Sequence, residues 1–336
     1  MLTIPKKIKE DLRKKHYGIV GNHSAVQICE WTKKSLRNQG ECYKHQFYGV
    51  KTYSCSQVSP NAIWCDQNCI FCWRPAENML KGEIKDKVDD PKETIDNLVK
   101  ERYKLLTGFK GQENINKAKL KIALNEFPLH WAISLSGEPT LYPKLTEFIK
   151  ELQKRKVESI FVVSNGQNPD VIKKLEKKNA LPTQLYISLD AWDEKSYDKI
   201  NKGIRKDAWK RFLKTLDLLK NLKCRTVIRL TVIKGLNDSK KAIKQFGKLI
   251  EIAQPDFLEI KSYMHLGYSR KRLKRENMPS FEELKEFAKD LEKYLKSMEY
   301  EDDNIPSKII LYQNTGKNRV KKKPNRWIIS KENWLF

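Results

Sequence analysis

Cys65, Cys69 and Cys72 lie within eight residues of one another. Three thiols this close in sequence cannot each form a separate disulfide, but they can turn inward around one metal centre. They supply one ligand fewer than the four that a closed zinc site or an iron–sulfur cluster takes. The spacing therefore predicts a metal centre with one position open to a ligand from outside the chain. The alternative is a zinc loop completed by a histidine or a distant cysteine.

A second set of cysteines precedes the first. Cys29, Cys42 and Cys55 are separated by gaps of 12 residues each, in a basic and polar segment. This spacing favours a second three-thiolate cluster, and scattered thiols buried as small apolar residues are the alternative. Lys44 lies two residues after Cys42, so its amine is a candidate for a Schiff base if burial and nearby positive charge lower its pKa. In a chain so rich in lysine, an ordinary lysine is the other interpretation.

The chain is strongly basic. Its 67 lysines and arginines outnumber its 42 acids, which gives a formal net charge of +25 over 336 residues. Such a field concentrates polyanions, and phosphate neutralisation supplies most of the non-specific affinity for nucleic acid. A lysine-rich surface of the thermophilic kind would normally carry matching glutamates, and the acids here fall well short. The composition therefore favours a nucleic-acid substrate.

Two segments concentrate basic charge toward the C-terminus. Residues 270–275 hold five cations in six positions, and residues 317–326 hold six in ten without an acid. Cations for phosphates together with aromatic rings for unstacked bases are typical of RNA-loop recognition, and a solvated charge run is the alternative. The aromatic residues beside the second segment are Tyr312, Trp327, Trp334 and Phe336.

The composition also bounds the cellular setting. With 39% hydrophobic residues the chain can bury a sizeable core. It contains no run of 18 apolar residues, so we expect no membrane span. Its N-terminus lacks the apolar segment of a signal peptide, which predicts a cytoplasmic protein. In that reducing compartment, thiols bind metals rather than form disulfides.

The elements that must position these residues follow a regular pattern from residue 129 onward, where short apolar runs alternate with amphipathic segments. The alternation predicts a parallel sheet whose strands are joined by helices in right-handed crossovers. We expect strands at 129–135, 159–163, 184–189, 224–233, 256–262 and 308–312. We expect helices at 5–15, 24–38, 91–106, 114–124, 169–178, 194–200, 206–222, 239–252 and 280–298, and one that begins at 143.

Polar residues follow several of these strands. In a parallel sheet the carboxyl ends of the strands share one edge, and binding sites form there. Each residue alone is more simply explained as part of a turn or a helix cap. Together with the cysteine loop they predict a single pocket, formed by Glu138, Ser164, Asn165, Ser188, Asp190 and Asn237.

Residues 65–72 resemble the signature of the radical S-adenosylmethionine (SAM) enzymes, in which an aromatic residue, here Phe71, precedes the third cysteine. The resemblance implies an α/β fold, a partial (β/α)6-type TIM barrel, here with N-terminal and C-terminal extensions. It implies that Cys65, Cys69 and Cys72 hold a 4Fe–4S cluster whose fourth iron binds the amino and carboxylate groups of SAM. An electron from the cluster would cleave SAM and give a 5′-deoxyadenosyl radical.

The same resemblance assigns roles within the predicted pocket. Residues 136–139 are similar to the family's Gly-Gly-Glu-Pro-like motif, with serine in place of the first glycine. The ammonium group of SAM would donate hydrogen bonds to Glu138 and to nearby carbonyls. Arg229 either pairs with the methionine carboxylate or is a charge that lines the barrel. The residues expected to bind SAM are Phe71, Glu138, Asn165, Ser188, Asp190 and Arg229.

The two cysteine sets, Lys44 and the basic charge together resemble the archaeal tRNA 4-demethylwyosine synthases, over the whole chain. The resemblance implies that the radical removes a hydrogen from the N-methyl group of 1-methylguanosine-37 in phenylalanine tRNA. The methylene radical then adds to the carbonyl carbon of pyruvate, the carboxyl carbon of pyruvate leaves, and ring closure with loss of water gives 4-demethylwyosine. The protein would be a carbon–carbon lyase with two 4Fe–4S clusters. The second cluster, on Cys29, Cys42 and Cys55, would anchor pyruvate while Lys44 forms the Schiff base.

Organisation and partners follow from this resemblance. We expect an N-terminal extension at 1–60, the barrel at 61–312 and a basic tail at 313–336. The flavodoxin-like domain of eukaryotic relatives is not found in the sequence, so we expect an external electron donor of flavodoxin or ferredoxin type, and a monomer. Two other functions stay open: a radical SAM methyl- or methylthiotransferase acting on RNA, and a zinc-dependent RNA-binding protein. A methyltransferase would need a methyl-accepting cysteine, and only Cys224, more simply a core residue, is left for that role.

Overall fold

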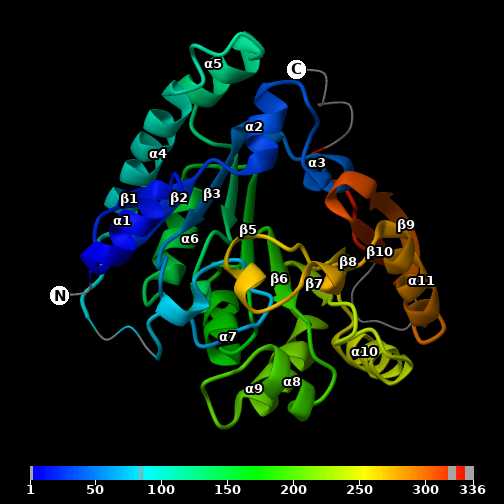
Figure 1. Cartoon of the computed structure of the whole chain (residues 1–336). Helices are drawn as coiled ribbons and strands as arrows, with labels where there is room; N and C mark the ends of the chain where they lie inside the picture. The colour runs from blue at the N-terminus through cyan, green and yellow to red at the C-terminus, as the bar shows by residue number, and fades with distance from the viewer. Residues whose placement is uncertain (1–2, 83, 85, 317–322, 330–336) are drawn as a thin grey trace.

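The computed structural model describes residues 3–82, 84, 86–316 and 323–329, and its strands form one continuous sheet (Figure 1). The strand order is β1-β2-β3-β4-β5-β6-β7-β8-β10-β9. The six central strands pair in parallel, as the predicted alternation requires. They are β3 (Cys55–Ser59), β4 (His130–Ile133), β5 (Ser159–Ser164), β6 (Gln184–Ser188), β7 (Arg225–Val232) and β8 (Phe257–Ser262).

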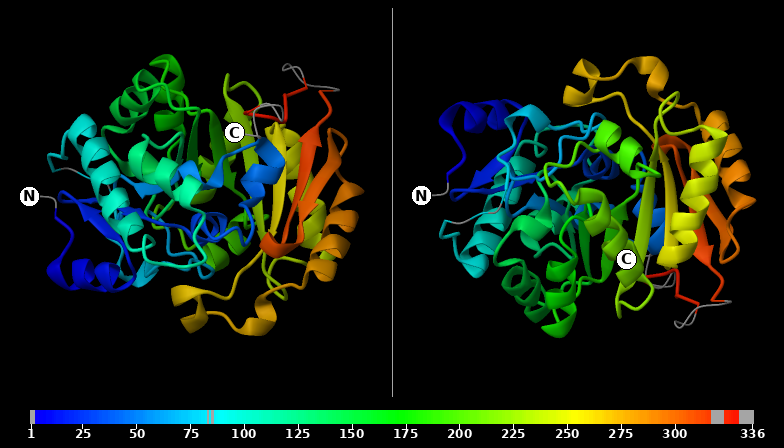
Figure 2. Two further views of the ribbon diagram at one scale, coloured as in Figure 1. Left: turned by 90° about the horizontal axis from the view of Figure 1, so that it is seen from above. Right: turned by 90° about the horizontal axis from the view of Figure 1, so that it is seen from below.

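Helices surround this curved sheet on the outside (Figure 2). Their amphipathic faces pack onto the sheet through the main apolar core, which excludes water from one side of each strand. The first long helix begins where its sequence dictates, because Asp90 caps it and Pro91 occupies its first turn. The helices in this layer are α4 (Pro91–Thr107), α6 (Leu145–Lys154), α7 (Pro169–Lys177), α8 (Glu194–Ile200), α9 (Ala208–Leu219), α10 (Lys240–Ala253) and α11 (Phe281–Glu292). Helix α5 (Lys117–Asn125) packs beside α4 in a separate apolar cluster.

Antiparallel strands extend the sheet at both edges. Strands β1 (Gly18–Val20) and β2 (Ser24–Gln27) lie beside β3, and α1 (Lys6–Lys14) precedes them. Strands β10 (Ile309–Asn314) and β9 (Met298–Asn304) lie beside β8. Among the described residues, no helix is both long and apolar enough to cross a membrane.

Two predicted helices were wrong in part. The helix expected at 24–38 is the strand β2 followed by α2 (Glu30–Leu36), because residues 25–27 pair with β3 and Cys29 then caps the helix. The helix expected at 280–298 ends at Glu292, and the chain turns into β9 from residue 298. In the first place pairing with a neighbouring strand overrides the local helical pattern. In the second, residues 293–297 form the turn between α11 and β9.

A short helix from the N-terminal segment fills the interior of the barrel. Helix α3 (Tyr43–Tyr48) ends at Gly49, whose left-handed φ of 80° lets the chain turn away. Phe47 and Tyr48 of this helix are fully buried. They belong to a second apolar cluster with residues of β5 to β8, namely Phe161, Tyr186, Val227 and Phe257. The N-terminal segment therefore reaches the centre of the sheet, next to the positions where catalysis is expected.

The described part of the basic tail packs against this helix. Arg326 donates a hydrogen bond of 3.0 Å to the carbonyl of Phe47 and pairs with Glu301 at 2.8 Å. Of the basic run predicted at 317–326, residues 317–322 lie outside the described residues, as do Trp334 and Phe336. The domain boundaries at 60/61 and 312/313 stay a prediction.

Candidate active site

The first cysteine set follows β3 at the carboxyl edge of the parallel sheet. All three thiols are free, and burial together with Cys72 and Cys65 raises the pKa of Cys69, so the three sulfurs share one environment. Within the described residues, no three His, Cys, Asp or Glu side chains are gathered tightly enough to hold a single metal ion. A four-iron cluster does not need such a tight group, because each thiolate binds a different iron, and a set of three soft sulfur ligands fits it.

Backbone contacts with distant segments hold this loop in place. The amide of Ile70 donates to the carbonyl of Ile200 at 2.9 Å. Arg272 donates to the carbonyl of Ile70 at 3.1 Å and to that of Cys72, and it pairs with Glu77 at 2.7 Å. The loop is therefore braced from two sides. The predicted residue Phe71 packs against a small apolar cluster of Ile200, Ile233, Tyr263 and Leu273.

The motif at residues 136–139 packs directly on the start of the cysteine loop. Gly137 has a φ of 73°, and a Cβ atom there would lie 2.3 Å from the carbonyl oxygen of Asn61 and 2.7 Å from that of Trp64. Only glycine fits this close approach. The next amide, that of Glu138, donates to the Trp64 carbonyl at 2.7 Å. The motif thus fixes the distance between β4 and the cysteine loop.

The carboxylate of Glu138 ties the ends of two strands together. Its Oε1 accepts hydrogen bonds from the Thr140 amide at 3.0 Å and from the Ser164 hydroxyl at 2.8 Å. Its Oε2 accepts one from the Asn165 amide at 2.7 Å. The side chain of Asn165 in turn donates to Asp66 of the cysteine loop at 2.6 Å. The predicted residues Glu138, Ser164 and Asn165 are thus brought together, and these hydrogen bonds are structural.

Two buried acceptors lie beside Cys69 without a donor. Asp190 Oδ2 and Asn201 Oδ1 accept no hydrogen bond in the described structure. Burial raises the pKa of Asp190 to about 7, and its charge raises the pKa of Cys69. The Nδ2 of Asn201 lies 3.9 Å from the sulfur of Cys69. Because SAM carries ammonium and hydroxyl donors, these acceptors fit it.

The remaining polar residues of this edge divide into two kinds. Ser188 is half-buried at the end of β6, where the strand register places it opposite Arg229. Asn237 is fully buried, and its side chain donates to the carbonyl of Asp190 at 2.9 Å. Asn237 therefore positions the turn that carries Asp190. Asn201 was not predicted, because it lies 132 residues from Cys69 and no local motif marks it.

The second cysteine set is brought together from three elements. Cys29 caps α2, Cys42 caps α3, and Cys55 opens β3. Burial together with Cys29 and Cys42 raises the pKa of Cys55, so the three thiols interact. Thr52 joins their segments, because its Oγ1 accepts from the Cys42 amide at 3.1 Å and its carbonyl accepts from Thr32 at 3.2 Å. Three free, half-buried thiols that lie together again fit an iron–sulfur cluster.

Lys44 lies between this second set and the interior of the barrel. Its Nζ lies 4.1 Å from the ring centroid of Phe161 and 5.0 Å from that of Tyr186. Burial and Arg229 lower the pKa of this amine, and Cys42 and Cys55 act in the opposite direction. The predicted catalytic lysine is therefore a buried residue and not one of the many surface lysines.

Arg229 forms an ion pair inside the barrel. Its guanidinium donates to Glu259 Oε2 at 3.0 Å, and Tyr48 and Tyr186 donate to Glu259 Oε1 at 2.8 and 3.1 Å. This contact favours the interpretation of Arg229 as a charge that lines the barrel. Glu259 and Lys261, the partly buried lysine two positions on, were not predicted, although two charges alternating along a central strand were a signal that both face the interior.

The sequence of this chain is similar to those of known proteins over nearly its whole length. The Radical SAM superfamily model matches residues 62–246, and the Wyosine base formation model matches residues 252–314. An S-adenosyl-L-methionine-dependent tRNA 4-demethylwyosine synthase of Pyrococcus horikoshii is 44% identical over 92% of this chain and 89% of its own length. The synthase of Methanocaldococcus jannaschii is 45% identical over 93% and 97%.

A solved structure, described as TYW1 with a lysine-pyruvate adduct bound, has the same fold. It superposes with a TM-score of 0.82 at 42% identity, over 94% of this chain and 98% of that one. The expected radical SAM fold is therefore confirmed. The chain belongs to the family of S-adenosyl-L-methionine-dependent tRNA 4-demethylwyosine synthases and is a radical SAM enzyme.

Proposed function

We propose that this protein condenses 1-methylguanosine-37 of phenylalanine tRNA with pyruvate to form 4-demethylwyosine, and that the carboxyl carbon of pyruvate is lost. The observation that carries the proposal is the position of Lys44, which is buried in the barrel between aromatic rings and the second cysteine set. The similar solved structure of TYW1 has a lysine–pyruvate adduct bound. A reactive amine enclosed at this point of the barrel suits the capture of a keto acid.

The role assigned to Lys44 is covalent. The neutral Nζ of Lys44 adds to the keto carbon of pyruvate, and a C=N double bond then replaces the C=O bond. The carbonyl oxygen leaves as water together with the two hydrogens of the amine. The rings of Phe161 and Tyr186 beside the amine exclude solvent and limit the orientations of the adduct. The pyruvate methyl and carboxyl carbons are then held in one arrangement relative to the incoming nucleotide.

Cys65, Cys69 and Cys72 would hold the 4Fe–4S cluster that, with SAM, supplies the one-electron chemistry of the radical SAM family. The unpaired acceptors Asp190 Oδ2 and Asn201 Oδ1 would receive hydrogen bonds from SAM. The SAM contacts expected for Phe71, Asn165 and Ser188 belong to the same proposal. Glu138 would contribute mainly by holding the strand ends together, since both of its carboxylate oxygens already accept hydrogen bonds from backbone amides.

The further partners are proposed on the same basis. Cys29, Cys42 and Cys55 would hold a second 4Fe–4S cluster next to the keto acid. An external flavodoxin or ferredoxin would supply the electron, and the reaction would take place in the cytoplasm, where tRNA is available. The predicted monomeric state stays a prediction.

The position of Cys224 in the sheet disfavours a methyltransferase. This residue precedes β7, so it lies at the amino edge of the parallel sheet, opposite the edge that carries the cysteine loop. It packs partly buried against the main core. A methyl-accepting thiol would have to reach SAM at the other edge.

The proposal is tested by the nucleosides of the product. Anaerobically reconstituted protein is given SAM, a reductant, tRNA that carries 1-methylguanosine, and pyruvate labelled with ¹³C at a single carbon. We expect a new tricyclic nucleoside that contains label from the second and third carbons and none from the first. A methylated or methylthiolated nucleoside, or retention of the first carbon, would show that the proposed reaction is wrong.

A further inference from the structure

A cavity of about 590 Å³ lies on the segment that follows β8, outside the site described above. It is lined by the apolar residues Met264, Leu266 and Met278 and by the polar or basic residues His265, Arg270 and Arg275. A volume of this size is typical of small-ligand sites, and polarizable, flexible methionines suit a flat ring. Leu266 is 40% exposed, so the apolar wall faces water.

The segment that lines the cavity packs against the end of the cysteine loop. The amide of Tyr268 donates to the carbonyl of Trp73 at 3.0 Å. Gly267, with a φ of 54°, lies so close to the same carbonyl that a Cβ atom would come within 2.4 Å of it. Met278 packs on the same small apolar cluster as Phe71. A ligand in this cavity would therefore lie next to the segment that carries the first cluster.

The three arginines of the basic run at 270–275 divide into two kinds. Arg272 is turned inward, where it pairs with Glu77 and donates to carbonyls of the cysteine loop. Arg270 and Arg275 line the cavity, and neither forms an ion pair with a described acid. Phosphate contact, which the sequence predicts for this run, is therefore open to these two arginines and not to Arg272.

An aromatic platform stands beside the cavity. Trp73 is 45% exposed, and the guanidinium of Arg74 lies 3.9 Å from its ring centroid. Arg74 is itself buried and lies 4.9 Å from the ring of Tyr17, so the indole is held from behind. A fixed, exposed indole next to arginines without an acidic partner is the combination that binds single-stranded nucleic acid through stacking and phosphate contact.

We infer that this cavity binds an unstacked base of the tRNA anticodon loop, next to the nucleotide being modified, while Arg270 and Arg275 contact the flanking phosphates and Trp73 stacks on a neighbouring base. The inference rests on the proposed function, since it needs a tRNA substrate. It adds a second recognition point, because a nucleotide drawn into the barrel must be unstacked from its neighbours, and those neighbours must then find other partners.

The test compares the affinities of the wild-type and variant proteins for a 17-nucleotide anticodon stem-loop that carries 1-methylguanosine. Each neighbour of the modified base is replaced in turn by an abasic site. For the wild-type protein we expect one of the two replacements to weaken binding on the order of tenfold, the usual effect of one stacked base. In Leu266→Ser and Met278→Ser variants, the same replacement should have little further effect.

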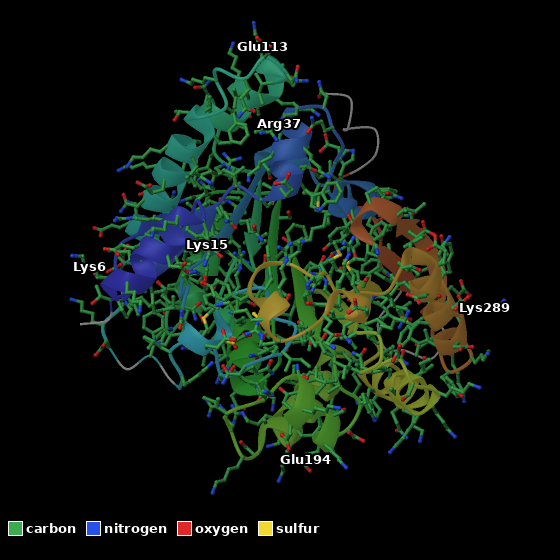
Figure 3. All side chains as sticks on the ribbon, viewed as in Figure 1. Lys6, Lys15, Arg37, Glu113, Glu194 and Lys289 are labelled. Carbon is green, nitrogen blue, oxygen red and sulfur yellow. The ribbon has the colours of Figure 1, made fainter. Side chains whose placement is uncertain are left out.

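The arginines have a separate readout. Arg270→Gln and Arg275→Gln should each reduce the slope of log K against log salt concentration by about one. Lys289→Gln is the matched control, because Lys289 is an exposed cation that points away from the molecule on α11 (Figure 3), and its slope should equal that of the wild type.

Two outcomes would overturn the inference. If the abasic replacements weaken the wild type and both serine variants equally, no base occupies the cavity, although the proposed function would stand. If the wild-type protein does not bind the stem-loop at all, the proposed function fails and the inference fails with it. Unfolding midpoints equal to the wild type show that the serine variants are folded, and Leu266 is exposed enough to make that the expected result.

Discussion

The Nε of Arg229 lies 3.0 Å from Oε2 of Glu259, in an ion pair that joins β7 to β8 inside the barrel. The side chain of Glu259 is fully buried, so the guanidinium of Arg229 is the cation that compensates its negative charge. Arg229→Met should lower the free energy of unfolding by about 3–5 kcal/mol, because it leaves a buried carboxylate without its partner.

The double variant Arg229→Met/Glu259→Leu is the control for that prediction. Removing both charges should recover most of the lost stability in urea unfolding of the metal-free protein. If the double variant were as unstable as the sum of the two single variants, the ion pair would not be the reason for the loss. In that case Arg229 would have to be reconsidered as a ligand of SAM.

Arg272 should control how firmly the first cysteine set holds iron. It donates to the carbonyls of Ile70 and Cys72, so its loss removes a brace from the loop and not a ligand. We expect Arg272→Gln to lower the iron content after reconstitution at least twofold, with the unfolding midpoint changed little. Lys271→Gln, an exposed neighbour, is the control, and equal iron in both variants would contradict the role.

The two cysteine sets should hold independent clusters. Anaerobic reconstitution of the wild type should give about eight iron atoms and eight sulfides per chain, and the Cys29/Cys42/Cys55 triple alanine variant about four. The triple variant should keep uncoupled cleavage of SAM but form no tricyclic base. About four irons in both proteins would show that the second set is not a cluster site.

His23 should make the N-terminal segment sensitive to acid. Burial lowers the pKa of His23 below its usual 6.5, while its Nδ1 lies 2.5 Å from the Pro60 carbonyl and its Nε2 accepts from the Asp89 amide at 3.0 Å. As the pH falls, His23 therefore takes up a proton in the unfolded chain before it does so in the folded chain. Its contribution to the free energy of unfolding is present above pH 6.5 and is lost as the pH falls below that value.

A His23→Gln variant keeps a donor and an acceptor but does not titrate. Its free energy of unfolding, measured in urea at pH 7.5 and at pH 5.5, should fall less on acidification than that of the wild type. An identical fall in the two proteins would mean that His23 does not titrate on unfolding in this range.

The first cysteine loop and the parallel sheet could be predicted because their signals are local. Cys65, Cys69 and Cys72 lie in one loop, and the strands from 129 onward show their apolar pattern over a few residues. Strand β3 could not be predicted, because residues 55–59 are mostly polar and form a strand only between β2 and β4. Its burial comes from tertiary pairing, which no short pattern records.

The residues that support the site could not be predicted from the sequence either. Arg272 contacts the cysteine loop across 202 residues of sequence, and Asn201 reaches Cys69 across 132. Glu138 lies beyond the end of β4, as predicted, and its hydrogen bonds to Ser164 and Asn165 could not be predicted; its contact with SAM stays a prediction. A sequence motif indicates where a residue lies more reliably than which partners it has there.

The most direct test of the central claim is reductive trapping at Lys44. Protein incubated with labelled pyruvate is treated with cyanoborohydride, digested, and analysed by mass spectrometry. We expect one pyruvate-derived adduct on the peptide that contains Lys44, absent from a Lys44→Arg variant that retains the iron content of the wild type. Trapping at other lysines only, or equal trapping in the variant, would contradict the account of the keto acid held at Lys44.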